Sequence, residues 1–243
     1  MSVAKPFFLL ADAQLLVLRG EGDRLLERVR RAAEGGEPGR PLRAAWLGAS
    51  ADDSPEGFEL FAAAMERISP VECRMVRSAP SDDERAFLES ADLVLLSGGD
   101  TARGWNRLRQ SGLDAALRER HVAGAVLMGI SAGAIQLGPR GWRGSSPGPG
   151  DLFDTLGLLP FVVDAHAEAT WRRLRQVLLL VGEGARGIGI PAGGAAVVHP
   201  DGAVEAVRHP VTELSVSGGA VRQRLLAPEP AVRHDGRPRS GRV

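Results

Sequence analysis

Short apolar runs alternate with amphipathic stretches over most of the chain. The apolar runs have the length and composition of buried strands, and the stretches between them carry apolar residues at helical spacing. Strands are predicted at 6–11, 42–50, 71–76, 92–100, 124–131 and just before residue 166, and helices at 23–36, 54–68, 81–91, 104–121 and 168–184. Because strands alternate with helices, we predict an α/β fold whose mainly parallel sheet is sandwiched by helices.

The last part of the chain has a different pattern, with short β-like pieces and a hairpin turn at "HPDGAV" (199–204). We predict a single α/β domain over 1–227 and a disordered tail over 228–243, which is rich in Pro, Gly and Arg. Residues 138–151 are a Gly/Pro-rich loop next to the strand at 124–131. Such a loop either covers a site or is a disordered crossover.

Composition excludes several classes of protein. Lys+Arg and Asp+Glu both number 30, so the formal net charge is zero, which argues against a general nucleic-acid or membrane-surface binder. The single cysteine, Cys73, allows neither an intrachain disulfide nor a cysteine-based zinc site. The N-terminal apolar run is too short for a signal peptide or a membrane span, so we expect a cytoplasmic protein.

The stretch "GISAG" (129–133) joins a predicted strand to a predicted helix. G-x-S-x-G in that context is the pattern of a nucleophile elbow, a sharp turn that needs small neighbours and presents the serine hydroxyl at the end of the sheet. Ser131 is therefore the candidate nucleophile. The backbone N–H of Ala132, the next residue, is a candidate oxyanion donor.

A second glycine-rich turn, "SGGDT" (97–101), also follows a predicted strand. It matches neither phosphate-binding glycine motif. Because the carboxyl ends of parallel strands meet at one edge of a sheet, this turn is expected to lie near Ser131. There the N–H of Gly99 would be a second oxyanion donor, and Asp100 and Thr101 would face the substrate.

A serine nucleophile needs a base, and that base needs an acceptor that orients it. Of the five histidines, His166 alone lies at a strand end with a carboxylate on each side, Asp164 and Glu168. We therefore take His166 as the candidate base.

The elbow, the "SGGDT" turn, the "DAH" strand (164–166) and the late stretch "RGIGIPAGGAAVV" (186–198) form an ordered set. Over most of residues 6–227 this set resembles the serine peptidases that include peptidase E (aspartyl dipeptidase) and cyanophycinase. The resemblance implies a class I glutamine amidotransferase-like fold, which is flavodoxin-like, and a homodimer. It also implies Ser131 as nucleophile, His166 as base, and Gly99 and Ala132 as oxyanion donors, without a metal or another cofactor.

The family resembled here cleaves bonds next to aspartyl or β-aspartyl units, using arginines downstream of the histidine. In this chain those arginines would be Arg172, Arg173 and Arg175, although a solvated helix face explains them equally well. The expected substrate is therefore a small peptide or amide that carries an acidic group.

Two positions depart from the family pattern. Peptidase E has an aspartate in the loop after the nucleophile, whereas this loop has none before Asp151, and cyanophycinase-like members have a glutamate where this chain reads Pro-Ala-Gly-Gly (191–194). The spacing His166-Ala167-Glu168 matches the H-x-E of class I glutamine amidotransferases, so we favour Glu168 as the orienting acid. Asp164 is the alternative, because alternation along a strand puts residues 164 and 166 on one face.

The sequence thus predicts a serine hydrolase that forms an acyl-enzyme. The missing family carboxylates motivate one alternative, a non-catalytic protein of the same fold that binds a ligand or a partner. A glutamine amidotransferase subunit is disfavoured, because serine replaces the cysteine of that class.

Overall fold

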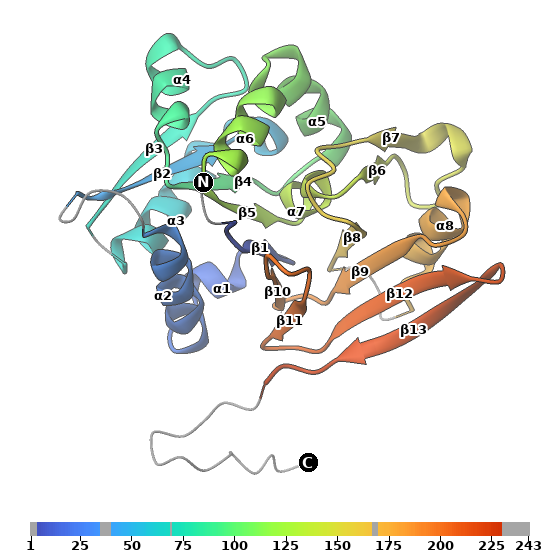
Figure 1. The fold of residues 1–243 in the computed structure, drawn as a ribbon. Helices are drawn as coiled ribbons and strands as arrows, with labels where there is room; N and C mark the ends of the chain where they lie inside the picture. The colour runs from blue at the N-terminus through green and yellow to red at the C-terminus, as the bar shows by residue number, and fades with distance from the viewer. Residues whose placement is uncertain (1–3, 35–39, 69, 167–169, 230–243) are drawn as a thin grey trace, which may run out of the picture.

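A computed structural model of the chain describes residues 4–34, 40–68, 70–166 and 170–229 (Figure 1). Its main sheet has seven strands in the order β11-β10-β1-β5-β4-β2-β3. The parallel strands are β1 (Phe7–Leu10), β2 (Leu42–Leu47), β3 (Val71–Val76), β4 (Leu93–Leu96) and β5 (Val126–Ile130). A hairpin formed by β10 (Ala195–Val198) and β11 (Val204–Val207) adds two antiparallel strands at one edge. This hairpin contains the predicted turn, and the α/β prediction is confirmed.

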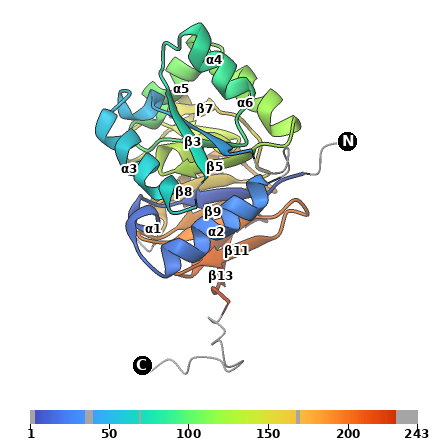
Figure 2. The ribbon, with the colours of Figure 1, turned by 90° about the vertical axis from the view of Figure 1, so that its left-hand side faces the viewer.

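Helices cover both faces of the main sheet (Figures 1 and 2). One face packs against α1 (Gln14–Val17), α2 (Glu21–Ala33) and α3 (Pro55–Glu66). The other packs against α4 (Asp82–Glu89), α5 (Thr101–Gln110), α6 (Leu113–Val122) and α7 (Ala132–Leu137). Along β1, side chains alternate between the two cores, because successive residues of a strand point to opposite faces.

A second sheet, which the sequence pattern did not separate from the first, has the order β13-β12-β9-β8. Its strands are β8 (Val162–Ala165), β9 (Arg186–Ile190), β12 (Val211–Ser217) and β13 (Ala220–Leu226). Val163 and Ile188 pack into the core that α4–α7 share, whereas Val162 and Leu214 pack under α8 (Arg172–Val181). Apolar runs predict strands but not their partners, since pairing is decided by contacts distant in sequence.

The Gly/Pro-rich stretch at 138–151 is more ordered than its composition suggests. It contains β6 (Arg140–Trp142) and a 3-10 turn (Pro149–Asp151), and β6 pairs antiparallel with β7 (Leu152–Asp154). We call residues 140–154 the β6–β7 arm. Of the two readings left open for 138–151, the disordered crossover is therefore wrong over β6, a strand too short to give a periodic signal.

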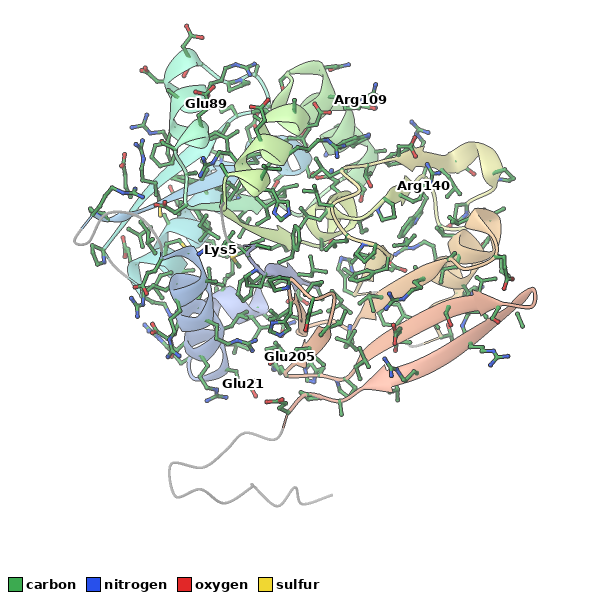
Figure 3. The ribbon with its side chains drawn as sticks, viewed as in Figure 1. Lys5, Glu21, Glu89, Arg109, Arg140 and Glu205 are labelled. Carbon is green, nitrogen blue, oxygen red and sulfur yellow. The ribbon has the colours of Figure 1, made fainter. Side chains whose placement is uncertain are left out.

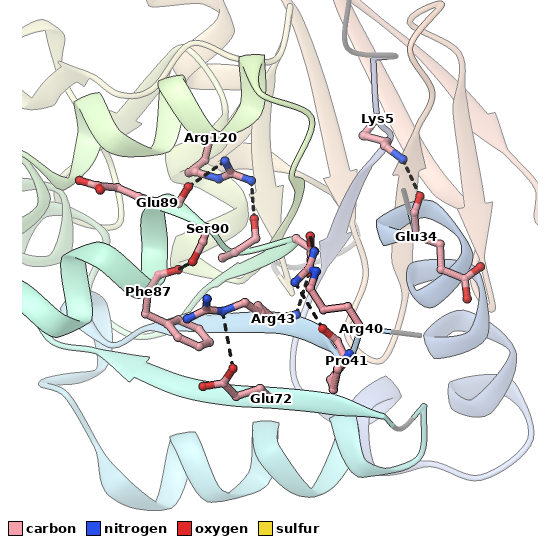
Figure 4. Close-up of polar contacts among 12 residues, drawn as sticks. Lys5, Glu34, Arg40, Pro41, Arg43, Glu72, Phe87, Glu89, Ser90 and Arg120 are labelled. Atoms are coloured by element: carbon pink, nitrogen blue, oxygen red, sulfur yellow. Dashed lines mark hydrogen bonds and ion pairs between the residues drawn. The ribbon is translucent and has the colours of Figure 1, made fainter. Parts of the chain in front are cut away.

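Arginine side chains fix the amino ends of the central strands (Figure 4). Arg120 of α6 donates to the carbonyl of Ala91 at 2.6 Å. Asp92 accepts from Arg40 at 2.7 Å and from the backbone N–H of Arg43 at 2.9 Å. These contacts lie at the end of the sheet opposite to the carboxyl ends of the strands. The candidate site residues follow those carboxyl ends.

Residues 230–243, most of the predicted tail, lie outside the described residues. In the described part of the chain, no helix is both long and apolar enough to span a bilayer.

Helix α7 starts directly after β5 and lies close to the sheet. A Cβ at Gly133 would be 2.2 Å from the carbonyl oxygen of Leu96, and a Cβ at Gly129 would be 2.5 Å from the backbone nitrogen of Ala134. Because these neighbours are backbone atoms of β4 and α7, they cannot rotate away. Both positions of the G-x-S-x-G pattern therefore require glycine.

Gly133→Val is expected to lower the free energy of unfolding by at least about 2 kcal/mol, because β4 and α7 would have to separate. Gly150→Val is the matched control, since a Cβ there meets nothing within 4 Å. Chemical denaturation of both variants measures the difference. Equal stability of the two variants would contradict the close packing described here.

Candidate active site

Ser131 lies between the end of β5 and the start of α7. Its backbone has φ 48° and ψ −108°, a conformation that non-glycine residues rarely adopt. The N–H of Ser131 donates to the carbonyl of Leu10 on β1 at 2.9 Å, and its carbonyl accepts from Ile135 at 3.1 Å. The strained turn is therefore held from both sides, as expected for a nucleophile elbow.

His166 reaches the serine from the second sheet. Strand β8 ends at Ala165, and His166 has φ 44°. Its N–H donates to the carbonyl of Ile190 at the end of β9, at 2.8 Å. The His166 ring then lies with Nε2 2.7 Å from Oγ of Ser131. In the tautomer protonated at Nδ1, Nε2 accepts the hydroxyl proton, which is the arrangement that activates a serine.

The "SGGD" turn after β4 lies at the same edge. Gly99 has φ 127°, and a Cβ there would be 2.0 Å from the carbonyl oxygen of Ser50. That same carbonyl accepts the N–H of Asp100 at 3.0 Å. Buried Gln136 of α7 donates to Oγ of Ser50 and to the carbonyl of Thr101, both at 3.0 Å. Gln136 thus ties the glycine turn to the helix that follows Ser131.

These elements enclose one pocket of about 450 Å³. It is lined by Gly99, Asp100, Thr101, Ala102, Ser131, Ile135, Trp142, Arg143, Gly144, Ala165, His166 and Arg173. The residues come from the ends of β4, β5 and β8, from the β6–β7 arm, and from α5, α7 and α8. Four of the predicted site elements therefore meet: the serine, the histidine, the glycine turn and one downstream arginine.

Asp100 and Thr101 line the pocket as the sequence predicts, and they also begin α5. The Asp100 carboxylate caps that helix, because its Oδ1 accepts the N–H of Arg103 at 2.8 Å. Ala132 is buried and opens α7. An N–H in the first turn of a helix has no partner inside the helix, so that of Ala132 is suited to a developing negative charge.

Asp164, the alternative orienting acid, has no hydrogen bond to the imidazole among the described residues. Its side chain is fully buried, and Oδ1 accepts from Arg173 at 2.9 Å and from the N–H of Ala165 at 3.0 Å. Burial raises the pKa of the Asp164 carboxyl above its ordinary value, and the ion pair with Arg173 opposes that rise. Strand β8 ends at Ala165 and His166 has a positive φ, so the regular alternation on which the pairing of residues 164 and 166 is based stops before His166.

Glu168, the favoured orienting acid, lies outside the described residues. Within the described ranges, no carboxylate is hydrogen-bonded to the His166 ring, and no group of three or more His, Cys, Asp or Glu residues could hold a metal ion.

The three downstream arginines separate. Arg173 lines the Ser131 pocket, whereas Arg172 and Arg175 line a different surface cavity beside β13, with Thr170, Gln176, Leu179 and Gln223. The helical turn explains the division, since successive residues of a helix point about 100° apart. The expected substrate contact of Arg172 is therefore not found in the pocket that holds Ser131.

The sequence reasoning missed Trp142 and Arg143 of the β6–β7 arm as pocket residues. The Trp142 ring lies under the Arg173 guanidinium, with 5.5 Å from the guanidinium carbon to the ring centroid. The sequence feature that could have identified them is an aromatic residue followed by an arginine, in the glycine-rich stretch directly after α7.

Comparisons with known proteins support the fold. The structure of a peptidase from an acI-B1 actinobacterium superimposes with a TM-score of 0.70 at 18% identity, covering 93% of this chain and 95% of the other. A peptidase E candidate from Listeria monocytogenes EGD-e gives 0.57 at 15% identity, covering 93% and 100%. At these identities the likeness establishes the fold. No protein with a curated description matches the sequence.

The sequence model of peptidase family S51 matches residues 51–206, which include Gly99, Ser131 and His166. Because this match covers more than half of the 243 residues, the chain belongs to peptidase family S51.

Proposed function

We propose that the protein is a serine hydrolase that cleaves a peptide or amide bond of a small substrate, as an exopeptidase or amidase. Membership of peptidase family S51 supports a peptidase function. The observation that carries the proposal is the 2.7 Å contact between Ser131 Oγ and His166 Nε2 inside a pocket. That pocket, of about 450 Å³, is in the usual size range of small-molecule sites, roughly 300–1,000 Å³.

The proposed reaction begins when Ser131 Oγ attacks the scissile carbonyl carbon and His166 Nε2 takes the hydroxyl proton. The carbonyl oxygen becomes an oxyanion, which the N–H groups of Gly99 and Ala132 would stabilise. Protonated His166 then gives its proton to the leaving amine as the carbon–nitrogen bond breaks. Water, deprotonated by His166, hydrolyses the resulting ester and restores the serine. Each proton taken by His166 is returned, so the cycle is balanced without a cofactor.

We assign the orienting role to Glu168. Two observations support this choice over Asp164: the H-x-E spacing, and the hydrogen bonds of Asp164 Oδ1 to Arg173 and to the Ala165 amide. An acid at His166 Nδ1 would fix the tautomer in which Nε2 accepts the serine proton, and it would stabilise the imidazolium.

Ser131 is expected to form one covalent adduct with a fluorophosphonate probe. Intact-mass spectrometry should show a single addition, absent in Ser131→Ala and slowed at least roughly 10³-fold in His166→Asn, because the hydroxyl then lacks its base. Ser146→Ala, on the exposed surface of the arm, is the matched control and should label like the native protein. Absence of labelling in the native protein would favour the alternative, a ligand-binding protein without catalysis.

Glu168→Gln is expected to lower turnover by roughly 10³–10⁴, with little change in substrate binding, because loss of the orienting acid acts mainly on the transition state. Steady-state kinetics on a substrate found by screening a dipeptide library would measure this. The reverse ranking, with Asp164→Asn the slower enzyme, would transfer the role to Asp164.

Asp164→Asn is expected to affect stability more than turnover. Removing the carboxylate leaves Arg173 without its partner, so the free energy of unfolding should fall by about 1–3 kcal/mol, less than for a fully buried pair because Arg173 is partly exposed. Thermal and chemical denaturation would measure the loss. An Asp164→Asn protein with unchanged stability would show that the ion pair contributes nothing to the fold.

A further inference from the structure

The two arginines of the Ser131 pocket have different electrostatic surroundings. Arg173 is paired with the buried Asp164 at 2.9 Å, so its charge is compensated within the protein. Arg143 is exposed, and its guanidinium carbon lies 5.2 Å from the centroid of the Phe153 ring. No carboxylate in the described part of the chain forms an ion pair with it. The pocket therefore contains one guanidinium that has an aromatic support but no counter-charge.

The carboxylate of Asp100, which also lines the pocket, does not supply that counter-charge. It caps α5 through the N–H of Arg103, and the positive end of the helix dipole favours its charge there. Arg143 is left as the pocket group best suited to an anion from outside the protein. A guanidinium binds carboxylates through two parallel hydrogen bonds, which makes a carboxylate the matching chemistry.

The backbone that carries Arg143 is anchored at several points. The N–H of Arg143 donates to the carbonyl of Asp151 at 3.1 Å, which continues the pairing of β6 with β7. Farther along the arm, the Pro147 carbonyl accepts from Gln176 of α8 at 2.7 Å. The arm is thus fixed to α8, the helix that also supplies Arg173. Such anchoring limits the conformational entropy lost when Arg143 binds a ligand.

We propose that Arg143 is the specificity-determining residue of this site and binds a free carboxylate of the substrate. The proposal rests on the proposed function, since the substrate has to bring its scissile bond to Ser131. It assigns the contact to the β6–β7 arm, whereas the sequence pattern pointed to the arginines of α8. An anchored arginine that lines this pocket selects acids over their neutral amides, because a guanidinium matches a carboxylate in charge and in hydrogen-bond geometry.

Binding to the Ser131→Ala variant tests the proposal without turnover. Two pairs of probes place a carboxylate on either side of the peptide bond: Ala-Leu against Ala-Leu amide, and Asp-Leu amide against Asn-Leu amide. NMR titration gives a dissociation constant for each probe. In at least one pair the acid should bind about tenfold more tightly than the neutral member, as expected for a charge-assisted contact.

Adding Arg143→Gln should reduce that discrimination to below about threefold, whereas adding Arg140→Gln should leave it intact. Arg140 is the matched control because it lies on β6 of the same arm (Figure 3), is paired with Asp154, and does not line the pocket. The proposal is overturned if Arg143→Gln retains the discrimination, if Arg140→Gln loses it equally, or if no probe pair shows it.

The labelling of Ser131 separates this result from the proposed function. If Arg143 is needed for acid-over-amide discrimination but the native protein does not react with the fluorophosphonate, the carboxylate-binding proposal stands and the hydrolase proposal is wrong. If Ser131 is labelled but no probe pair shows acid-over-amide discrimination, the hydrolase proposal stands and the role proposed for Arg143 is wrong.

Discussion

The contact between Ser131 and His166 depends on two backbone turns that both hold a non-glycine residue at positive φ, 48° and 44°. Each such conformation costs on the order of 1–3 kcal/mol and persists only where its surroundings determine it. Here a neighbouring strand fixes each turn through the residue's own N–H, β1 through Leu10 and β9 through Ile190. The two sheets thus position the two halves of the candidate catalytic pair before any ligand arrives.

The rest of the structure keeps those two turns at a fixed separation. Apolar residues of the second sheet, including Val163 and Ile188, share a core with the main sheet, so the end of β8 cannot shift without disturbing packed side chains. Two glycines allow close backbone contacts near the site. Gly133 lets α7 lie against β4, and Gly99 lets the "SGGD" turn lie against Ser50. The site is therefore preorganised mainly by backbone packing, with buried Gln136 as its main side-chain tie.

Local patterns were sufficient to predict the strand–helix order, the turn at Ser131, the glycine turn and the histidine that contacts the serine. Each of these has a signature within a few residues, because a sharp turn restricts its immediate neighbours. The second sheet, the pocket residue Arg143 and the separation of Arg172 from Arg173 could not be predicted in the same way. Strand pairing depends on distant contacts, and the division of Arg172 from Arg173 depends on the rotation of α8 relative to the pocket.

The strand-face argument for Asp164 assumed an extended backbone as far as His166. Side chains alternate between the two faces only while the backbone remains extended. Strand β8 ends at Ala165, and the turn at His166 then brings the imidazole ring to Ser131. Asp164, which lies within β8, is buried and accepts a hydrogen bond from Arg173, a residue that lines the pocket. A departure from the regular strand geometry thus brings His166 to Ser131, while the acid two residues earlier pairs with Arg173.

The central claim is that the turn at Ser131, the turn at Gly99 and His166 form one catalytic centre. A crystal structure of the protein after reaction with a fluorophosphonate tests it most directly, because the tetrahedral phosphorus imitates the acylation intermediate. The account predicts phosphorus bonded to Ser131 Oγ, with its oxyanion-like oxygen about 2.7–3.1 Å from the N–H nitrogens of both Gly99 and Ala132. Phosphorus on another residue, or that oxygen directed away from both amides, would contradict it.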